Sequence, residues 1–279
     1  MMRLDKFFSE LKIFSRREIA GELKKGFVKV NGVVIKKADF KIDENKDVIT
    51  YKDEVVKYKK FVYLKLNKPE GYISATEDLT QKTVLDLIPD NLRKFNLFPV
   101  GRLDKDTTGL VILTNDGISA HNALSPKHHV EKKYKFETAD PYTDLDIEAI
   151  QNGITLADGY TTKPCKIERI DNNNGYIILT EGKYHEIKRL FGARGNKIIA
   201  LQRISFSDIV LGDLPLGEYV HLTDEEENIF INKNPRLTRR GFSHLSPRQT
   251  TGSSNHAAFW IAQLPLTPLL TRKRVFIFF

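Results

Sequence analysis

The sequence predicts a mixed α+β fold, with a small N-terminal module followed by a larger body built around a largely antiparallel sheet. In the body, most periodic segments alternate apolar and polar residues, as strands do, and shorter helical patterns lie between them. Residues 52–60 are polar and poor in core residues, which indicates a linker between a domain at 1–51 and a domain at 61–231.

The N-terminal module is expected to contain two short helices and a small sheet. Apolar residues recur at helical spacing at Leu4, Phe7, Phe8 and Leu11. A second helix is predicted to begin at Ser15, where Glu18 completes a capping box. The dipeptide Asn31-Gly32 between valines is typical of a type I′ hairpin turn, and residues 47–51 are expected to add a strand.

In the body, strands and helices are expected to alternate. Strands are predicted at 61–66, 110–114, 132–139, 164–170, 175–180, 204–210 and 217–222. Helices are predicted at 83–88, 117–124, 143–152 and 183–194.

The charge is distributed unevenly along the chain. The formal net charge is +8 at pH 7, made up of +6 over residues 1–60, −6 over 61–227 and +8 over 228–279. A basic N-terminal module on a mildly acidic body suggests a nucleic-acid-binding unit attached to a catalytic or structural one. A solvated, lysine-rich surface is the alternative interpretation.

Other features argue against membrane and disulfide-rich classes. No apolar run approaches the roughly 20 residues needed to span a bilayer, and Asp5 follows too soon for a secretory signal. A single cysteine, Cys165, excludes an internal disulfide framework and is interpreted as a packing residue. We expect a cytoplasmic protein with no membrane partner.

The segment 232–279 differs from the rest of the chain. It has no acidic residue, scattered Pro and Ser, and no sustained helical or strand period. We interpret it as a basic tail, disordered or non-homologous. The alternative is an RNA-binding extension.

The segment Gly101–Leu110 is the strongest functional candidate. It holds Asp104 in a glycine-bracketed turn before the apolar run Leu110-Val111-Ile112-Leu113. An Asp in such a turn is usually a cap or turn residue. The sequence shows no metal-ligand spacing, P-loop or dinucleotide motif that would add a cofactor. The residues alone predict a two-domain RNA-binding protein with an unusual acidic turn.

The N-terminal module resembles the S4 RNA-binding domain over about residues 2–50. The resemblance is carried by Arg-Leu-Asp-Lys-Phe from Arg3, by Ser15-Arg16-Arg17 and by Val30-Asn31-Gly32. It implies an RNA partner gripped through phosphates, with binding that weakens as salt rises. The cations expected near phosphates are Arg3, Lys6, Arg16, Arg17, Lys24, Lys25 and Lys29.

The body resembles the pseudouridine synthases. The blocks that carry the resemblance occur in the family's order: Lys68-Pro69-Glu70-Gly71, Gly101-Arg102-Leu103-Asp104, Leu113-Thr114-Asn115-Asp116-Gly117, Lys132-Lys133-Tyr134 and Glu181-Gly182-Lys183-Tyr184-His185-Glu186-Ile187-Lys188-Arg189. The last blocks, Leu201-Gln202-Arg203-Ile204 and Leu214-Pro215-Leu216-Gly217-Glu218-Tyr219, also fit the family. Together with the S4-like module, the match spans about residues 2–231. Ser125-Pro126-Lys127-His128-His129 and Thr162-Lys163-Pro164 favour the group that modifies small-subunit ribosomal RNA.

The resemblance implies roles for particular residues. Asp104 is expected to be the nucleophile, or the carboxylate that stabilises charge and removes a sugar proton. It must be ionised, which an adjacent cation favours. Lys188 occupies the position of that cation, where many relatives have Arg, and Arg189 is the alternative partner.

The remaining expected roles concern the base. Tyr134 is expected to stack on the uracil and to help remove the C5 proton. Arg102 is expected to fill the gap left by a flipped base, and Leu103 and His185 to contact the substrate. Glu186 departs from the Gln expected after His185 and adds a negative charge near the site.

These resemblances imply an isomerase that needs no cofactor. It would convert one uridine, of the uridine-516 type, to pseudouridine in 16S ribosomal RNA. The RNA would be bound in a ribosomal assembly particle, and the enzyme would be a monomer. Two alternatives stay open: a sibling enzyme acting on 23S RNA, and a non-catalytic S4-type assembly factor.

Overall fold

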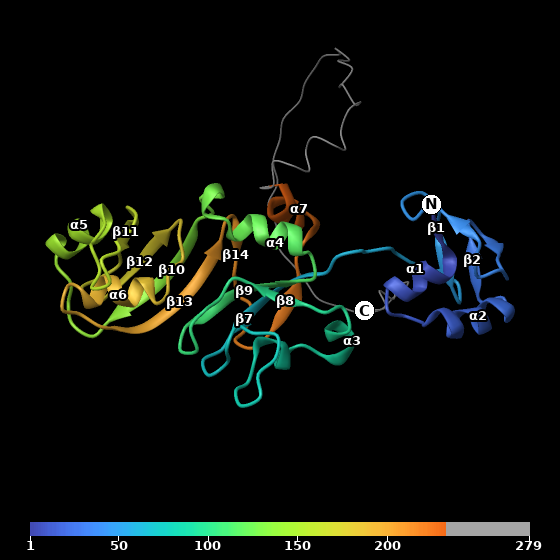
Figure 1. Ribbon diagram of the computed structural model, residues 1–279, viewed down its shortest axis with the longest axis horizontal. Helices are drawn as coiled ribbons and strands as arrows, with labels where there is room; N and C mark the ends of the chain where they lie inside the picture. Colours follow the sequence, from blue (N-terminus) through green and yellow to red (C-terminus); the bar gives the residue numbers. More distant parts are fainter. Residues whose placement is uncertain (233–279) are drawn as a thin grey trace, which may run out of the picture. The chain divides into compact units, whose positions relative to one another are not determined.

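The computed structural model describes residues 1–232, which form two compact units, Met1–Tyr58 and the described residues from Lys59 onward (Figure 1). The tail expected at 232–279 lies outside the described residues, apart from Asn232 at the end of a helix. Each unit has its own buried hydrophobic cluster.

The first unit pairs two helices with small antiparallel sheets. Its elements are β1 Met2–Arg3, α1 Leu4–Glu10, α2 Arg16–Lys24, β2 Val28–Val30, β3 Val33–Val34, β4 Lys41–Ile42, β5 Ile49–Tyr51 and β6 Glu54–Val56. The larger sheet has the order β3-β2-β5-β6, and β1 pairs with β4. Phe7 and Phe8 of α1 are completely buried in the core.

Local sequence signals set the boundaries of these elements. Ser15 accepts a hydrogen bond from the Glu18 N–H at 3.2 Å, and Glu18 accepts one from the Ser15 N–H at 2.7 Å. This confirms the predicted capping box. Asn31 and Gly32 have φ of 51° and 81° and turn the chain between β2 and β3, as the hairpin signal predicts.

The predicted linker at 52–60 is partly wrong, because β6 lies inside it and pairs with β5. Lys52 and Asp53 have φ of 51° and 66°, which makes them a tight hairpin turn. Val56 is buried in the core of the first unit. The polar composition that suggested a linker is therefore the composition of a turn and an edge strand.

The second unit is built on one large sheet. Its strands are β7 Tyr63–Lys68, β8 Phe98–Val100, β9 Thr108–Thr114, β10 Lys132–Thr138, β11 Lys166–Arg169, β12 Asn174–Leu179, β13 Ile198–Phe206, β14 Ile209–Val210 and β15 Tyr219–His221. The strand order is β11-β12-β10-β13-β9-β7-β15, with β14 paired to β13 and β8 to β9. All these pairings are antiparallel except that of β9 with β13. The predicted, largely antiparallel α+β fold is confirmed.

Helices cover parts of this sheet. They are the 3-10 helices η1 Val84–Leu87 and η2 Pro126–His128, and the α-helices α3 Asp90–Arg93, α4 Gly117–Leu124, α5 Asp144–Asn152, α6 Glu186–Gly192 and α7 Asp224–Asn232. Figure 1 shows α6 beside β13, which it contacts, and α4 beside β8 and α7. Among the described residues, no helix has the length and apolar character needed to cross a membrane.

The parallel pairing of β9 with β13 depends on a glycine. Gly109 lies opposite Arg203 with a φ of 103°. A Cβ atom on residue 109 would lie 2.3 Å from the Arg203 carbonyl oxygen, which is too close for any side chain. This close approach fixes the start of β9, and with it the turn that carries Asp104.

Three predicted elements differ from the structure. The strand expected at 204–210 is the end of β13, a turn at Ser207 (φ 56°) and β14, because apolar alternation continues across the turn. The helix expected at 183–194 begins only at Glu186, since His185 is left-handed at φ 48°. The helix expected at 83–88 is the 3-10 helix η1.

Candidate active site

Asp104 lies in the turn between β8 and β9, and a neighbouring segment holds this turn in shape. The Ser74 hydroxyl accepts a hydrogen bond from the Leu103 N–H at 2.9 Å and donates one to the Leu103 carbonyl at 3.1 Å. The Thr107 N–H closes the turn on the Asp104 carbonyl at 3.1 Å. The backbone around the carboxylate is thus fixed on both sides.

A buried lysine, Lys68, donates hydrogen bonds to backbone carbonyls of the same turn. Lys68 ends β7 and is completely buried. Its Nζ donates hydrogen bonds to the carbonyls of Pro69 (3.1 Å), Lys105 (3.2 Å) and Thr107 (2.7 Å). Burial lowers the pKa of Lys68 to about 8, although the negative charges of Asp106 and Asp104 oppose that shift. The buried ammonium therefore stabilises the backbone of the acidic turn through these hydrogen bonds.

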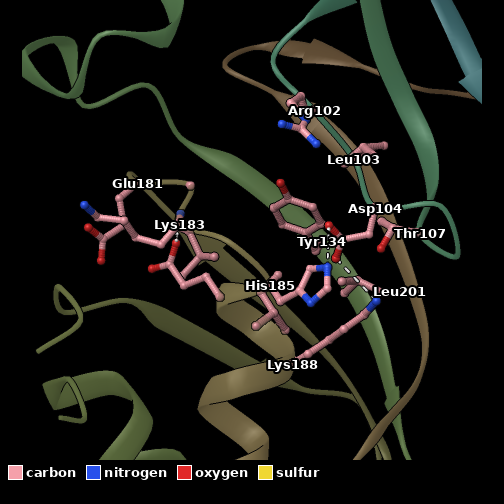
Figure 2. Close-up of a pocket in the computed structure, with 14 residues that line it drawn as sticks. Arg102, Leu103, Asp104, Thr107, Tyr134, Glu181, Lys183, His185, Lys188 and Leu201 are labelled. Atoms are coloured by element: carbon pink, nitrogen blue, oxygen red, sulfur yellow. Dashed lines mark hydrogen bonds and ion pairs between the residues drawn. The ribbon is translucent and has the colours of Figure 1, made fainter. Parts of the chain in front are cut away.

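The Asp104 carboxylate lies between two side chains of the segment that starts α6 (Figure 2). The Lys188 Nζ is 3.3 Å from Asp104 Oδ2, and the His185 Nε2 is 3.4 Å from Asp104 Oδ1. Lys188 also donates to Asp106 at 2.5 Å. The predicted juxtaposition of Asp104 with the cation at 188 is therefore present in the structure.

The two carboxylates keep Lys188 charged. Burial by itself lowers the pKa of Lys188, but the hydrogen bond to Asp106 and the charges of Asp104 and Asp106 outweigh burial and raise it. An ammonium that stays protonated favours an ionised carboxylate beside it.

Arg189, the alternative partner, turns away from Asp104. Its guanidinium pairs with Asp158 at 2.5 Å and donates to the Tyr184 carbonyl at 3.4 Å. It does not line the cleft around Asp104. The structure thus brings Lys188 to the carboxylate and leaves Arg189 as a link to the segment at 158.

The cleft next to Asp104 encloses about 80 Å³ and is walled by Tyr134 of β10. Tyr134 is 9% exposed, and Figure 2 shows its ring next to the Asp104 carboxylate. Arg102, Leu103 and His185 also line this cleft. Arg102 is exposed, whereas Leu103 is buried. Six of the seven predicted catalytic and substrate-binding residues therefore gather around one cleft.

Two glutamates on the cleft wall were not given a role by sequence reasoning. Glu181 accepts hydrogen bonds from the Tyr160 hydroxyl at 2.5 Å and from the Lys163 N–H at 2.8 Å. Glu186 is 4% exposed, and its Oε2 accepts the Lys183 N–H at 2.8 Å. No described residue forms a hydrogen bond with its Oε1.

Burial changes the charge expected at Glu186. Desolvation raises the pKa of Glu186 to about 7; the Lys183 N–H opposes that rise, and the nearby Glu181 adds to it. Glu186 therefore holds its negative charge less readily than the solvated carboxylate that the sequence suggests. The difference from the Gln that the resemblance predicts after His185 is the sequence signal that marks this position.

In the first unit, several of the predicted RNA-contacting cations already have acidic neighbours. Arg3 pairs with Asp5 at 2.8 Å, Lys6 with Glu10 at 3.4 Å, Lys25 with Glu22 at 2.8 Å, and Lys29 with Asp53. Arg16 and Arg17 are exposed in the first turn of α2, where the helix N-terminus also favours anions. Lys24 is exposed near the C-terminal end of the same helix.

Comparison with known proteins agrees with this fold. The RNA pseudouridylate synthase family matches residues 62–193, and the S4 domain matches residues 2–48. An uncharacterised RNA pseudouridine synthase of Bacillus subtilis, YtzG, is 42% identical over 81% of this chain and 96% of its own length.

Two further relatives extend the comparison. The ribosomal small subunit pseudouridine synthase A of Haemophilus influenzae is 39% identical over 81% of this chain and 97% of its own. A crystal structure of a pseudouridylate synthase aligns with a TM-score of 0.59 at 37% identity, and the alignment covers 83% of this chain and all of that one. The protein is therefore a member of the RNA pseudouridine synthase family that carries an S4 domain at its N-terminal end.

Proposed function

We propose that this protein converts one uridine of 16S ribosomal RNA, at a site of the uridine-516 type, to pseudouridine, with Asp104 as the essential carboxylate. The observation that carries the proposal is the contact of Asp104 with Lys188 and His185 in a cleft walled by Tyr134. The choice of 16S RNA is supported by relatives that are named for the small subunit and align over most of both chains.

The reaction is an isomerisation, so its balance needs no second substrate. The N1–C1′ bond breaks, a C5–C1′ bond forms, the C5 proton leaves, and N1 gains a proton. Asp104 acts at the sugar, either by bonding to C1′ or by taking a sugar proton, while the Lys188 ammonium stabilises its negative charge. A stacked uridine does not expose these atoms, so the base is flipped into the cleft.

The cleft contains groups suited to hold and deprotonate the flipped base. The Tyr134 ring offers a face on which uracil stacks, and its hydroxyl is the acceptor that we assign to the C5 proton. Arg102, exposed at the mouth of the cleft, takes the place of the everted base in the RNA. The S4 domain binds the RNA backbone through phosphate contacts, and a single protein chain acts on an assembly particle.

A tritium-release assay on RNA labelled at uridine C5 tests the role of Asp104. We expect Asp104→Asn to lower the rate by about 10³-fold or more, with RNA affinity changed only a few-fold. The matched control is Asp213→Asn, the same chemical change at an exposed position that does not line the cleft. Full activity in Asp104→Asn would remove this carboxylate from the mechanism.

Mapping of pseudouridine in ribosomal RNA tests the target. A strain that lacks the protein should lose one pseudouridine in 16S RNA, and plasmid-borne protein should restore it. Loss from 23S RNA instead would identify the sibling enzyme. No loss in either RNA, together with no tritium release, would favour a non-catalytic assembly factor.

A further inference from the structure

A second, larger cavity adjoins the catalytic cleft. It encloses about 280 Å³, against about 80 Å³ for the cleft around Asp104. The residues that line both are Arg102, Tyr134, Glu181, Gly182 and Lys183. A molecule that enters the cleft therefore has a direct continuation into the larger cavity along Tyr134.

The two cavities differ in charge. The ionisable residues that line the cleft are three Lys or Arg, three Asp or Glu and one His, which gives a balanced set. Five cations and a single acid line the larger cavity: Arg102, Lys132, Lys163, Lys183, Arg203 and Glu181. The cleft suits a neutral base and ribose, whereas the larger cavity suits an anion.

Two of these cations are buried, and neither forms an ion pair with a described residue. Lys132 is 8% exposed, and its Nζ donates to the Val130 carbonyl at 3.0 Å. Burial and the charge of Arg203 together lower the pKa of Lys132 to about 8, against the opposing charge of Glu186. The ammonium is nevertheless the main form at neutral pH.

Arg203 is the second buried cation. It is 2% exposed, and its Nε donates to the Leu110 carbonyl at 2.7 Å. Its Nη2 forms no hydrogen bond with any described residue. Buried guanidinium nitrogens are normally satisfied, so this unmet donor next to a second buried cation indicates a site that an anion completes.

Glu181, the one acid among the described residues that line the larger cavity, forms no ion pair with these cations. The two oxygens of Glu181 already accept hydrogen bonds from the Tyr160 hydroxyl and the Lys163 N–H. The Lys183 Nζ lies over the Tyr160 ring at 4.5 Å, at the exposed edge of the cavity. The Lys163 side chain is half-buried and also lines the cavity.

We infer that the larger cavity binds a backbone phosphate of the RNA strand next to the flipped uridine. The inference rests on the proposed function in one respect, namely that the cleft takes a uridine from an RNA strand. Lys132 and Arg203 supply the fixed charge at the cavity wall, and Lys163 and Lys183 supply cations nearer to solvent. Such a contact would hold the strand in register while the base lies against Tyr134.

Binding of pentauridylate by the full chain tests this subsite. Four further oligonucleotides each carry one neutral methylphosphonate linkage, at a different position. For the wild type, we expect one of the four modified strands to bind about tenfold more weakly than the unmodified strand. This corresponds to a loss of about 1.4 kcal/mol of binding free energy when one charged contact is removed. In the double variant Lys163→Gln/Lys183→Gln, the neutral linkage at that same position should weaken binding by less than about twofold. The effects of the other three linkages should be the same as in the wild type.

The matched control is Lys135→Gln/Lys197→Gln, which removes two exposed cations that line neither cavity. It should keep the wild-type preference among the linkages. The inference is overturned if the wild type shows no such preference, if the Lys163→Gln/Lys183→Gln variant keeps it, or if pentauridylate does not bind. These measurements do not involve 16S RNA, so failure of the proposed target would leave them unaffected.

Discussion

The buried Lys68 gives the sharpest physical prediction, because its stabilising and destabilising effects separate with pH. Replacing it by Met removes three hydrogen bonds to backbone carbonyls beneath the Asp104 turn. Each loss costs about 1 kcal/mol. The replacement also removes the cost of burying a charge. The fall in the pKa of Lys68 from 10.5 to about 8 corresponds to about 3 kcal/mol. At pH 7 these effects nearly cancel, so the free energy of unfolding of Lys68→Met should lie within about 1 kcal/mol of the wild-type value.

The pH dependence should nevertheless differ. Because the folded pKa of Lys68 lies below the unfolded one, the unfolded wild type binds one more proton between about pH 8 and 10.5. The free energy of unfolding therefore gains a rising contribution across this window, of up to about 1.4 kcal/mol per pH unit. Lys68→Met lacks that contribution. Lys132 has the same direction of shift but is present in both proteins, so it drops out of the difference.

Urea unfolding at several pH values from 7 to 10 measures the difference. Lys105→Met serves as the control, since it removes an exposed cation from the same turn. It should follow the wild-type slope. Turnover by Lys68→Met should fall by about 10²-fold at pH 7, because the turn that carries Asp104 loses its support. Equal pH slopes for Lys68→Met and the wild type would refute the assignment of a buried charge at this position.

Other substitutions test the site and its frame. Lys188→Gln should lower single-turnover tritium release by about 10²-fold, since it removes the cation beside Asp104, and Lys188→Arg should recover part of the rate; wild-type rates in Lys188→Gln would contradict the role of this cation. Gly109→Ala should lower the free energy of unfolding, measured in urea, by at least about 2 kcal/mol, because its Cβ would meet the Arg203 carbonyl at 2.3 Å. Gly117→Ala, which has open space around it, should leave that free energy unchanged. The folded pKa of Glu186, about 7, lies above its unfolded value of 4.5. The contribution of this group to the free energy of unfolding should therefore decrease as pH rises from 4.5 to 7. Glu186→Gln should flatten that decline in urea titrations, and an unchanged decline would count against a buried carboxyl.

Sequence reasoning reached the fold through local signals and the centre of the site through the motif blocks of the family resemblance. The capping box at Ser15 and Glu18 and the Asn31-Gly32 turn are decided by neighbouring residues, and the structure confirms both. Alternation located most strands of the large sheet, but it does not register turns made by ordinary residues. Ser207 and the pair Lys52-Asp53 take positive φ without glycine, so the adjoining strand boundaries were misjudged.

Long-range contacts set the limits of prediction at the site. The motif blocks indicated that Lys188 would meet Asp104, whereas nothing local distinguishes Lys188 from Arg189; the turn of α6 decides which faces the carboxylate. The role of Lys68 depends on carbonyls of Lys105 and Thr107, far along the chain. Such contacts follow from strand order, which alternation alone does not reveal.

The pairing of β9 with β13 also bears on when activity can arise during synthesis. The strand after the Asp104 turn lies against a partner made nearly one hundred residues later, at Gln202 and Arg203. A nascent chain that ends before this partner would carry the acidic turn and Tyr134 without the strand that fixes their spacing. We therefore expect an emerging chain to modify RNA only after residues 202 and 203 have been made and have paired with β9.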